Sequence, residues 1–190
     1  MKNNQQNNIL KILSNHELIP VATFTSVDEV KPVMNKLLEQ NIRCIEVTLR
    51  TECAINCIEK LREYFGNKIC IGVGTIVRPQ QIDEVKKFSP DFLVSPGFSK
   101  NLIEHLHNSG IAFLPGAITP AEIIQSMEHG CNILKFFPAH LFGGLSALKT
   151  YGGIFPSVTF CPTGGITKEN HQDYLRLSNV ISVGGSWLMD

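Results

Sequence analysis

Apolar residues recur along the chain in two alternating patterns. Short apolar or alternating runs are typical of strands, whereas longer segments with apolar residues near helical spacing are typical of helices. These runs predict eight strands, at residues 19–24, 44–50, 69–76, 92–96, 112–115, 133–139, 159–162 and 180–184. Helices are predicted between them, at residues 9–13, 27–41, 52–65, 79–88, 100–109, 121–129, 144–151 and 168–177.

The predicted strands start 20 to 26 residues apart, which leaves room for a crossover helix each time. Eight β-α units in a chain of 190 residues favour an α/β fold of the (β/α)8 TIM-barrel type. A doubly wound open sheet is the alternative, although no Gly-x-Gly-x-x-Gly follows the first strand. A leucine-rich solenoid would need a recurring short motif, and none is present. We expect one domain over residues 1–190, with residues 1–8 as a polar, flexible leader.

Composition and charge narrow the possible partners. Lysine plus arginine and aspartate plus glutamate both number 17, so the balance gives no support for a nucleic-acid or membrane-surface partner. No apolar run approaches the roughly 20 residues that span a bilayer, and the first eight residues lack a signal-peptide core. Cys53 and Cys57 are four residues apart on a predicted helix, but no nearby ligands complete a metal site. We therefore expect a cytoplasmic protein with reduced thiols and without a metal.

Lys135 is the charged residue that most needs an explanation. It follows Ile133 and Leu134 and precedes Phe136 and Phe137, within a run that predicts a buried strand ended by a proline. Burial disfavours the charged form of an amine, lowers its pKa and so favours a nucleophile. The alternative is an edge-strand lysine whose stem packs while its ammonium group reaches water.

The strand at residues 44–50 carries a second set of unusual polar positions. Alternation places Glu46, Thr48 and Arg50 on one face, and in a barrel that face points inward. Glu46 is then deep and Arg50 is at the mouth, where its guanidinium can bind a carboxylate through two hydrogen bonds. A lysine and a carboxylate together supply the groups for Schiff-base chemistry. A buried polar layer without a catalytic role is the other reading.

The ends of several strands carry the remaining candidates. Thr75 can add a hydroxyl beside Arg50, or it can simply fill a strand end. Gly164, Gly165, Gly185 and Ser186 follow the last two strands, where backbone N–H groups of barrels often bind phosphate. His140 lies just past the sixth predicted strand and can line the mouth, although the sequence favours no functional role for it.

Taken together, these motifs resemble the 2-keto-3-deoxy-6-phosphogluconate (KDPG) aldolase / 4-hydroxy-2-oxoglutarate aldolase family. The matching segments occur in order from about Ile19 to Leu188. They are the segments at residues 46–51, 72–75, 95–97, 115–116, 135–139, 162–166 and 184–188.

The resemblance implies a class I aldolase on a (β/α)8 barrel, a homotrimer that needs no metal or other cofactor beyond a lysine imine. The products would be pyruvate and glyceraldehyde 3-phosphate, or pyruvate and glyoxylate from 4-hydroxy-2-oxoglutarate. The resemblance also implies a role for each matching residue. Lys135 would be the Schiff-base lysine and Glu46 the general acid/base, while Arg50 and Thr75 would bind the substrate carboxylate. The pocket would be formed by Pro96, Phe137 and Thr163, and the phosphate would be bound by Gly164, Gly165, Gly185 and Ser186.

One departure and two competing functions remain open at this stage. Family members usually continue with another helix after Gly-Ser-Trp, whereas this chain stops at Asp190, so the last outer helix is expected to be missing. Either a longer protein has been trimmed or a neighbouring subunit covers the exposed barrel surface.

Two other functions are also consistent with these residues. A sugar-phosphate isomerase or lyase would use Glu46 as base without a covalent lysine. A non-catalytic phosphosugar-binding barrel would bind ligand without cleavage.

Overall fold

The computed structural model describes residues 2–189 and contains two parallel sheets. The six-stranded sheet has the order β5-β4-β3-β2-β1-β9, and the three-stranded sheet has the order β6-β7-β8. The strands are β1 Leu18–Ala22, β2 Cys44–Thr48, β3 Cys70–Gly74, β4 Phe92–Val94, β5 Ala112–Leu114, β6 Gly116–Ala117, β7 Ile133–Phe136, β8 Thr159–Pro162 and β9 Val183–Gly185. All of their pairings are parallel.

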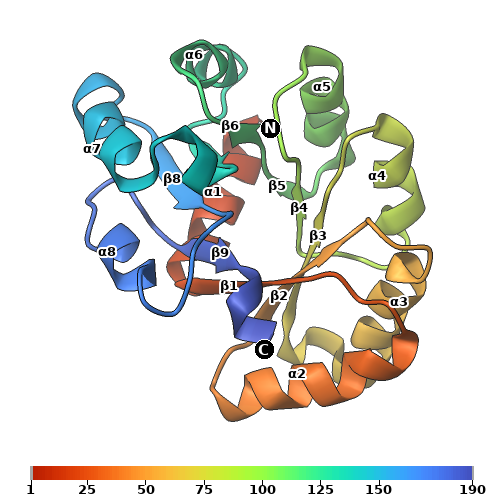
Figure 1. Cartoon of the computed structure of the whole chain (residues 1–190). Helices are drawn as coiled ribbons and strands as arrows, with labels where there is room; N and C mark the ends of the chain where they lie inside the picture. Colours follow the sequence, from red (N-terminus) through yellow and green to blue (C-terminus); the bar gives the residue numbers. More distant parts are fainter. Residues whose placement is uncertain (1, 190) are drawn as a thin grey trace.

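The two sheets are linked at both of their edges. The strands β5 and β6 are separated by Pro115 alone, and a proline has no N–H to donate to a ladder. On the other side, isolated bridges pair Phe160 with Val180 and Thr163 with Gly184. The sheet is therefore curled, as Figure 1 shows. The predicted α/β fold with a parallel sheet is confirmed, with the fifth predicted strand divided in two.

Helices surround the strands on the outside (Figure 1). The α-helices are α1 Lys2–Ser14, α2 Val30–Glu39, α3 Ala54–Phe65, α4 Pro79–Lys86, α5 Lys100–Ser109, α6 Pro120–Glu128, α7 Gly144–Ile154 and α8 His171–Leu175. Short 3-10 helices are η1 Val27–Glu29, η2 Gly66–Lys68, η3 Ala139–Phe142 and η4 Ser186–Met189. After β9 the described chain forms η4, and none of the described helices is long and apolar enough to cross a membrane.

Alternation along the strands divides the core into an outer and an inner layer. Ile45 and Val47 of β2 belong to the large cluster that packs the strands against the helices. Cys44 of the same strand belongs to a second cluster inside the curled sheet, together with Phe92 and Ile133. The predicted inward direction of the Glu46 face agrees with this division, because Glu46 alternates with the outer residues.

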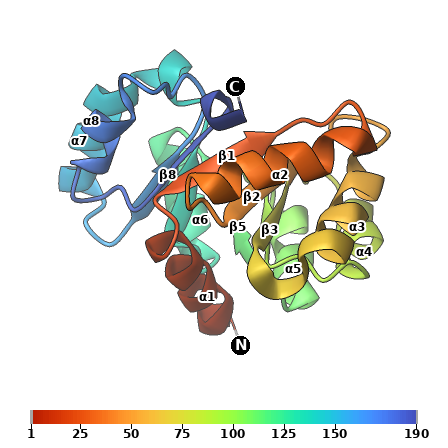
Figure 2. The ribbon, with the colours of Figure 1, turned by 90° about the horizontal axis from the view of Figure 1, so that it is seen from below.

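The helix α1 closes one end of the inner layer. Its Ile9 and Leu13 are completely buried in the inner cluster, and the helix contacts β5 and β7. Figure 2 shows α1 below the strands. The prediction of a flexible leader is wrong for the described residues 2–8, which belong to this helix.

Two glutamines explain why this polar segment is ordered. The side-chain amide of Gln5 donates to the carbonyls of Leu106 (3.0 Å) and Ile111 (2.7 Å). Gln6 Oε1 accepts hydrogen bonds from the backbone N–H groups of Asn132 (3.1 Å) and Ile133 (3.0 Å). Both side chains are buried, so they satisfy backbone groups that water does not reach.

Replacing Gln6 by leucine should therefore destabilise the fold. The change leaves two backbone donors without their acceptor, and we expect the free energy of unfolding to fall by about 2 kcal/mol or more. Urea denaturation measures this loss. Gln80→Leu, on the exposed side of α4, is the matched control and should change the value by less than about 0.5 kcal/mol. Equal values for the two variants would contradict the structural role of Gln6.

Candidate active site

A lysine and a glutamate meet inside the curled sheet. Lys135 Nζ lies 3.0 Å from Glu46 Oε1 and 3.2 Å from Oε2, although the residues are 89 positions apart in the sequence. Their side chains are only 6% and 4% exposed. The structure thus brings together the two residues that the sequence singled out, in the dry interior and not on an edge strand.

Glycines occupy the neighbouring strands beside this pair, and one of them, Gly74, leaves room for the carboxylate. Glu46 is paired in register with Gly72 of β3, and Lys135 is paired with Gly116 of β6. A Cβ atom on Gly74 would lie 2.1 Å from Glu46 Oε1, which is too close for any side chain. The carboxylate position therefore depends on a glycine two residues further along β3.

The surroundings of the amine are an aromatic ring and a neutral thiol. Lys135 Nζ lies 5.2 Å from the centre of the Phe137 ring, within the range of a cation–π contact. Cys161 is paired in register with Lys135, and burial raises the pKa of its thiol to about 11. Cys161 therefore stays protonated near neutral pH and does not compete with the lysine as a nucleophile.

A second pair of predicted residues meets at the carboxyl ends of β2 and β3. Arg50 Nε donates a hydrogen bond to Thr75 Oγ1 at 3.1 Å, and Arg50 is exposed. Thr75 has a φ of +63°, which is unusual for a β-branched residue. Such backbone strain, about 1 to 3 kcal/mol, is concentrated at functional sites.

A cavity of about 140 Å³ opens above the lysine. Its walls are Val21, Thr23, Arg50, Lys135, Phe137, Thr163, Gly164, Gly165, Ile166, Gly185 and Ser186. The cavity thus joins the amine to the glycine-rich strand ends predicted to bind phosphate. Glu46 and Thr75 do not line the cavity themselves. Each is hydrogen-bonded to a residue that does, Glu46 to Lys135 and Thr75 to Arg50.

Three predicted features differ in their placement. Pro96 does not line the cavity; its carbonyl group lies beside Gly116, where a Cβ would come within 2.3 Å. His140 is exposed and packs over Gly165. A Cβ atom added at Gly165 would lie 2.3 Å from the Cβ atom of His140. Cys53, just before α3, donates to the backbone carbonyl of Phe24, and Cys57, within α3, donates to that of Ser26.

Sequence reasoning missed three wall residues: Val21, Thr23 and Ile166. Thr23 follows β1, and its hydroxyl lies 2.7 Å from that of the buried Thr48. A signal for Thr23 was present, because the carboxyl ends of barrel strands face the site.

The sequence model of the family described as "Aldolase: KDPG and KHG aldolase" matches residues 9–190. The chain belongs to this family. The resemblance inferred from the motifs is thereby confirmed, as is the enzyme class, since aldolases are carbon–carbon lyases.

Curated relatives of the family are similar over most of their length. The chain is 38% identical to the KHG/KDPG aldolase of Escherichia coli K12 over 178 residues, or 94% of this chain and 83% of the relative. It is 37% identical to the 2-dehydro-3-deoxy-phosphogluconate aldolase of Dickeya dadantii, covering 94% and 84% of the two chains.

Solved structures of aldolases have the same fold. The KDPG aldolase of Legionella pneumophila, captured with pyruvate as a covalent carbinolamine, superimposes with a TM-score of 0.90 at 38% identity, over 94% of this chain and 86% of the other. The 2-keto-3-deoxy-6-phosphogluconate aldolase of Zymomonas mobilis ZM4 with 3-phosphoglycerate gives 0.92 at 34% identity, over 96% and 86%.

Removing one member of the buried ion pair of this aldolase should destabilise it more than removing both. Lys135→Met leaves a buried carboxylate without its cation, and the expected loss of unfolding free energy is about 3 to 5 kcal/mol. The double variant with Glu46→Leu removes both charges and should recover most of that loss. Urea denaturation at one fixed pH compares the two variants.

The exposed pair of Lys60 and Glu63 is the control for this comparison. Lys60→Met should change the stability little, because exposed ion pairs contribute little. A double variant that is as unstable as Lys135→Met would show that the charges do not depend on one another.

Proposed function

We propose that this chain is a class I aldolase that cleaves 2-keto-3-deoxy-6-phosphogluconate to pyruvate and glyceraldehyde 3-phosphate through a Schiff base on Lys135. The observation that carries the proposal is the buried amine, 3.0 Å from a carboxylate and facing a cavity, in a member of the KDPG and KHG aldolase family. Cleavage of 4-hydroxy-2-oxoglutarate to pyruvate and glyoxylate is the second reaction that the same groups can perform.

The first half of the reaction builds the imine. Glu46 accepts a proton from Lys135, and the free amine attacks the keto carbon of the substrate to form a carbinolamine. Glu46 then returns a proton to the carbinolamine hydroxyl, which leaves as water. The 3.0 Å contact between Lys135 Nζ and Glu46 Oε1 supports a direct first transfer.

The second half breaks the carbon–carbon bond. Glu46 takes the proton of the C4 hydroxyl, the C3–C4 bond breaks, and its electron pair moves into the iminium to give an enamine. The aldehyde product leaves, Glu46 returns its proton to C3 of the enamine, and water hydrolyses the imine to release pyruvate and regenerate Lys135. Because the iminium accepts the electrons, the reaction needs no metal or other cofactor.

Arg50 and Thr75 would hold the carboxylate next to the keto group. Their mutual hydrogen bond uses Nε of the guanidinium. A carboxylate can bind the remaining N–H groups of that plane in two parallel hydrogen bonds. Phe137 and Thr163 would shape the pocket around the reacting carbons, and Pro96 would support it from behind β6.

The glycine-rich wall would bind the phosphate. Gly164 and Gly165 have φ values of +92° and +72°, a backbone conformation that leaves no room for most side chains. Together with Gly185 and Ser186 they form one side of the cavity. Backbone N–H groups at such turns and a serine hydroxyl bind phosphate oxygens without a lysine.

We also infer that the two sheets form one closed (β/α)8 barrel. The continuous chain across Pro115 and the bridges between residues 160 and 180 and between residues 163 and 184 support this closure.

A homotrimer is our proposal for the assembly, in line with the family resemblance. The exposed apolar side chains of Leu141 and Phe142 offer a contact surface. Six free thiols support a cytoplasmic location.

Trapping with borohydride tests the covalent step. With pyruvate present, borohydride should fix one reduced pyruvate on Lys135, which peptide mass mapping locates. Lys135→Ala should lose both the adduct and the turnover, whereas Lys149→Ala, which changes an exposed lysine, should keep both.

Glu46→Gln should lower kcat by about 10²- to 10⁴-fold, because the general acid/base is lost. Turnover that persists in Lys135→Ala would favour an isomerase or a lyase with Glu46 as base, and ligand binding without pyruvate release would favour a binding protein.

The phosphate assignment predicts a difference between two substrates. Ser186→Ala should lower kcat/KM for the phosphorylated substrate about tenfold or more, because a hydrogen bond to a charged group is lost. The same variant should leave kcat/KM for 4-hydroxy-2-oxoglutarate nearly unchanged. Ser146→Ala, at an exposed position of α7, is the control. Equal losses for both substrates would place Ser186 away from the phosphate.

A further inference from the structure

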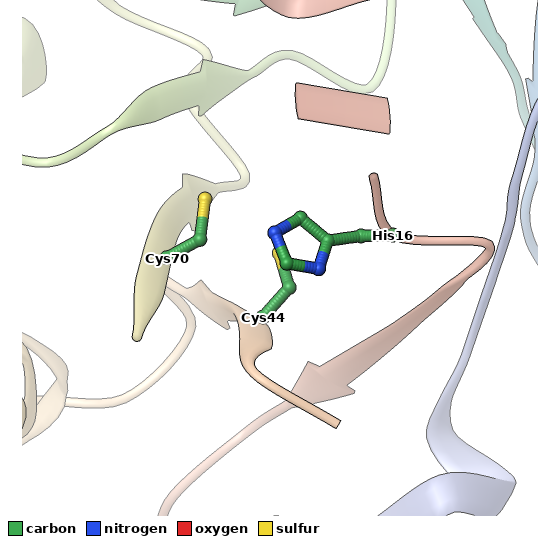
Figure 3. A group of neighbouring side chains, drawn as sticks. All are labelled: His16, Cys44 and Cys70. Carbon is green, nitrogen blue, oxygen red and sulfur yellow. The ribbon is translucent and has the colours of Figure 1, made fainter. Parts of the chain in front are cut away.

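Three metal-ligating side chains converge at the end of the strands opposite the candidate active site. His16 follows α1, Cys44 is the first residue of β2, and Cys70 is the first residue of β3. Figure 3 shows the His16 imidazole reaching from the loop before β1 toward the two cysteines. The sulfur atoms and a ring nitrogen all lie within 4.8 Å of one another. From this geometry we propose that His16, Cys44 and Cys70 bind a zinc-class cation.

The backbone holds two of these ligands side by side. Cys44 and Cys70 are register partners on neighbouring parallel strands, so their side chains leave the sheet on the same face. Cys70 N also donates to Arg43 O at 2.7 Å, which fixes the start of the ladder. The pair of sulfurs is therefore positioned by the sheet, and only the imidazole comes from a loop.

The spacing suits a tetrahedral ion. Zinc binds thiolate sulfur at about 2.3 Å and imidazole nitrogen at about 2.0 Å, so its ligand atoms lie about 3.5 to 3.8 Å apart. Small side-chain rotations bring the three atoms from within 4.8 Å to that separation. Two thiolates and one imidazole are a soft ligand set that favours zinc over magnesium or calcium, with one position left for a fourth ligand.

Asp91 Oδ2 accepts hydrogen bonds from Ile71 N and from Arg62 Nη2, both at 2.8 Å, so this carboxylate is already paired and the ligands of the proposed site are the two thiolates and the imidazole. Metal binding releases the thiol protons, because the thiolate is the form that ligates the metal.

A disulfide between Cys44 and Cys70 is the competing chemistry. It would require an oxidant that takes two electrons and two protons, and it would leave His16 without a role. The metal uses all three side chains. It would tie the exit of α1 to the starts of β2 and β3, so its role would be structural and independent of the aldolase reaction.

Zinc titration of the full chain tests the proposal. After treatment with chelator and reductant, native mass spectrometry should show one zinc per chain, and zinc should raise the Tm by about 5 °C or more at saturation. Cys70→Ser and His16→Gln should each weaken zinc binding at least about tenfold. Cys53→Ser changes a similarly half-buried cysteine outside the cluster and should bind zinc like the parent chain.

Alkylation of the unmodified chain gives a readout that needs no variant. Zinc should slow iodoacetamide labelling of Cys70, as located by peptide mapping, at least about tenfold, but should leave Cys53 labelling unchanged. The proposal is overturned if the chain takes up no zinc, if Cys70→Ser and His16→Gln bind zinc as tightly as Cys53→Ser, or if the isolated chain already holds a Cys44–Cys70 disulfide.

Discussion

The ion pair of Lys135 and Glu46 lies inside the curled sheet, and much of the surrounding sequence serves to accommodate it. Two charges in an apolar interior are stable only when each satisfies the other, and the 3.0 Å contact does so. Gly74 of the adjacent strand β3 leaves room for the carboxylate of Glu46. The outer faces of β2 and β7 are fully apolar and hold these strands against the helices.

The same pair has the properties that imine chemistry requires. The amine is kept from bulk water but faces a cavity, and its proton acceptor is already within hydrogen-bond distance. Preorganisation of this kind reduces the rearrangement needed during the reaction. Stability and the proposed catalysis therefore depend on one contact between strands. Arg50 and Thr75, which we propose to hold the substrate carboxylate, lie just beyond strand ends.

The sequence predicted the strands better than their surroundings. Five predicted strands begin at the observed residues, among them β2 and β7, because alternation and apolar runs are local signals. Glu46 and Lys135 were identified for the same reason, as charges within apolar strands. The helical state of residues 2–8 was missed, because Gln5 and Gln6 are ordered by backbone groups more than 100 residues away. The His16–Cys44–Cys70 cluster also depends on neighbours that only the fold brings together.

The position of α1 has a consequence for the order of folding. Its glutamines bond to partners 101 to 127 residues further along the chain, so this helix is synthesised long before the segments that order it. Contacts of such long range slow folding. Until β5 and β7 are synthesised, the inner layer that Ile9 and Leu13 enter is incomplete, and apolar side chains exposed in this interval are prone to aggregation.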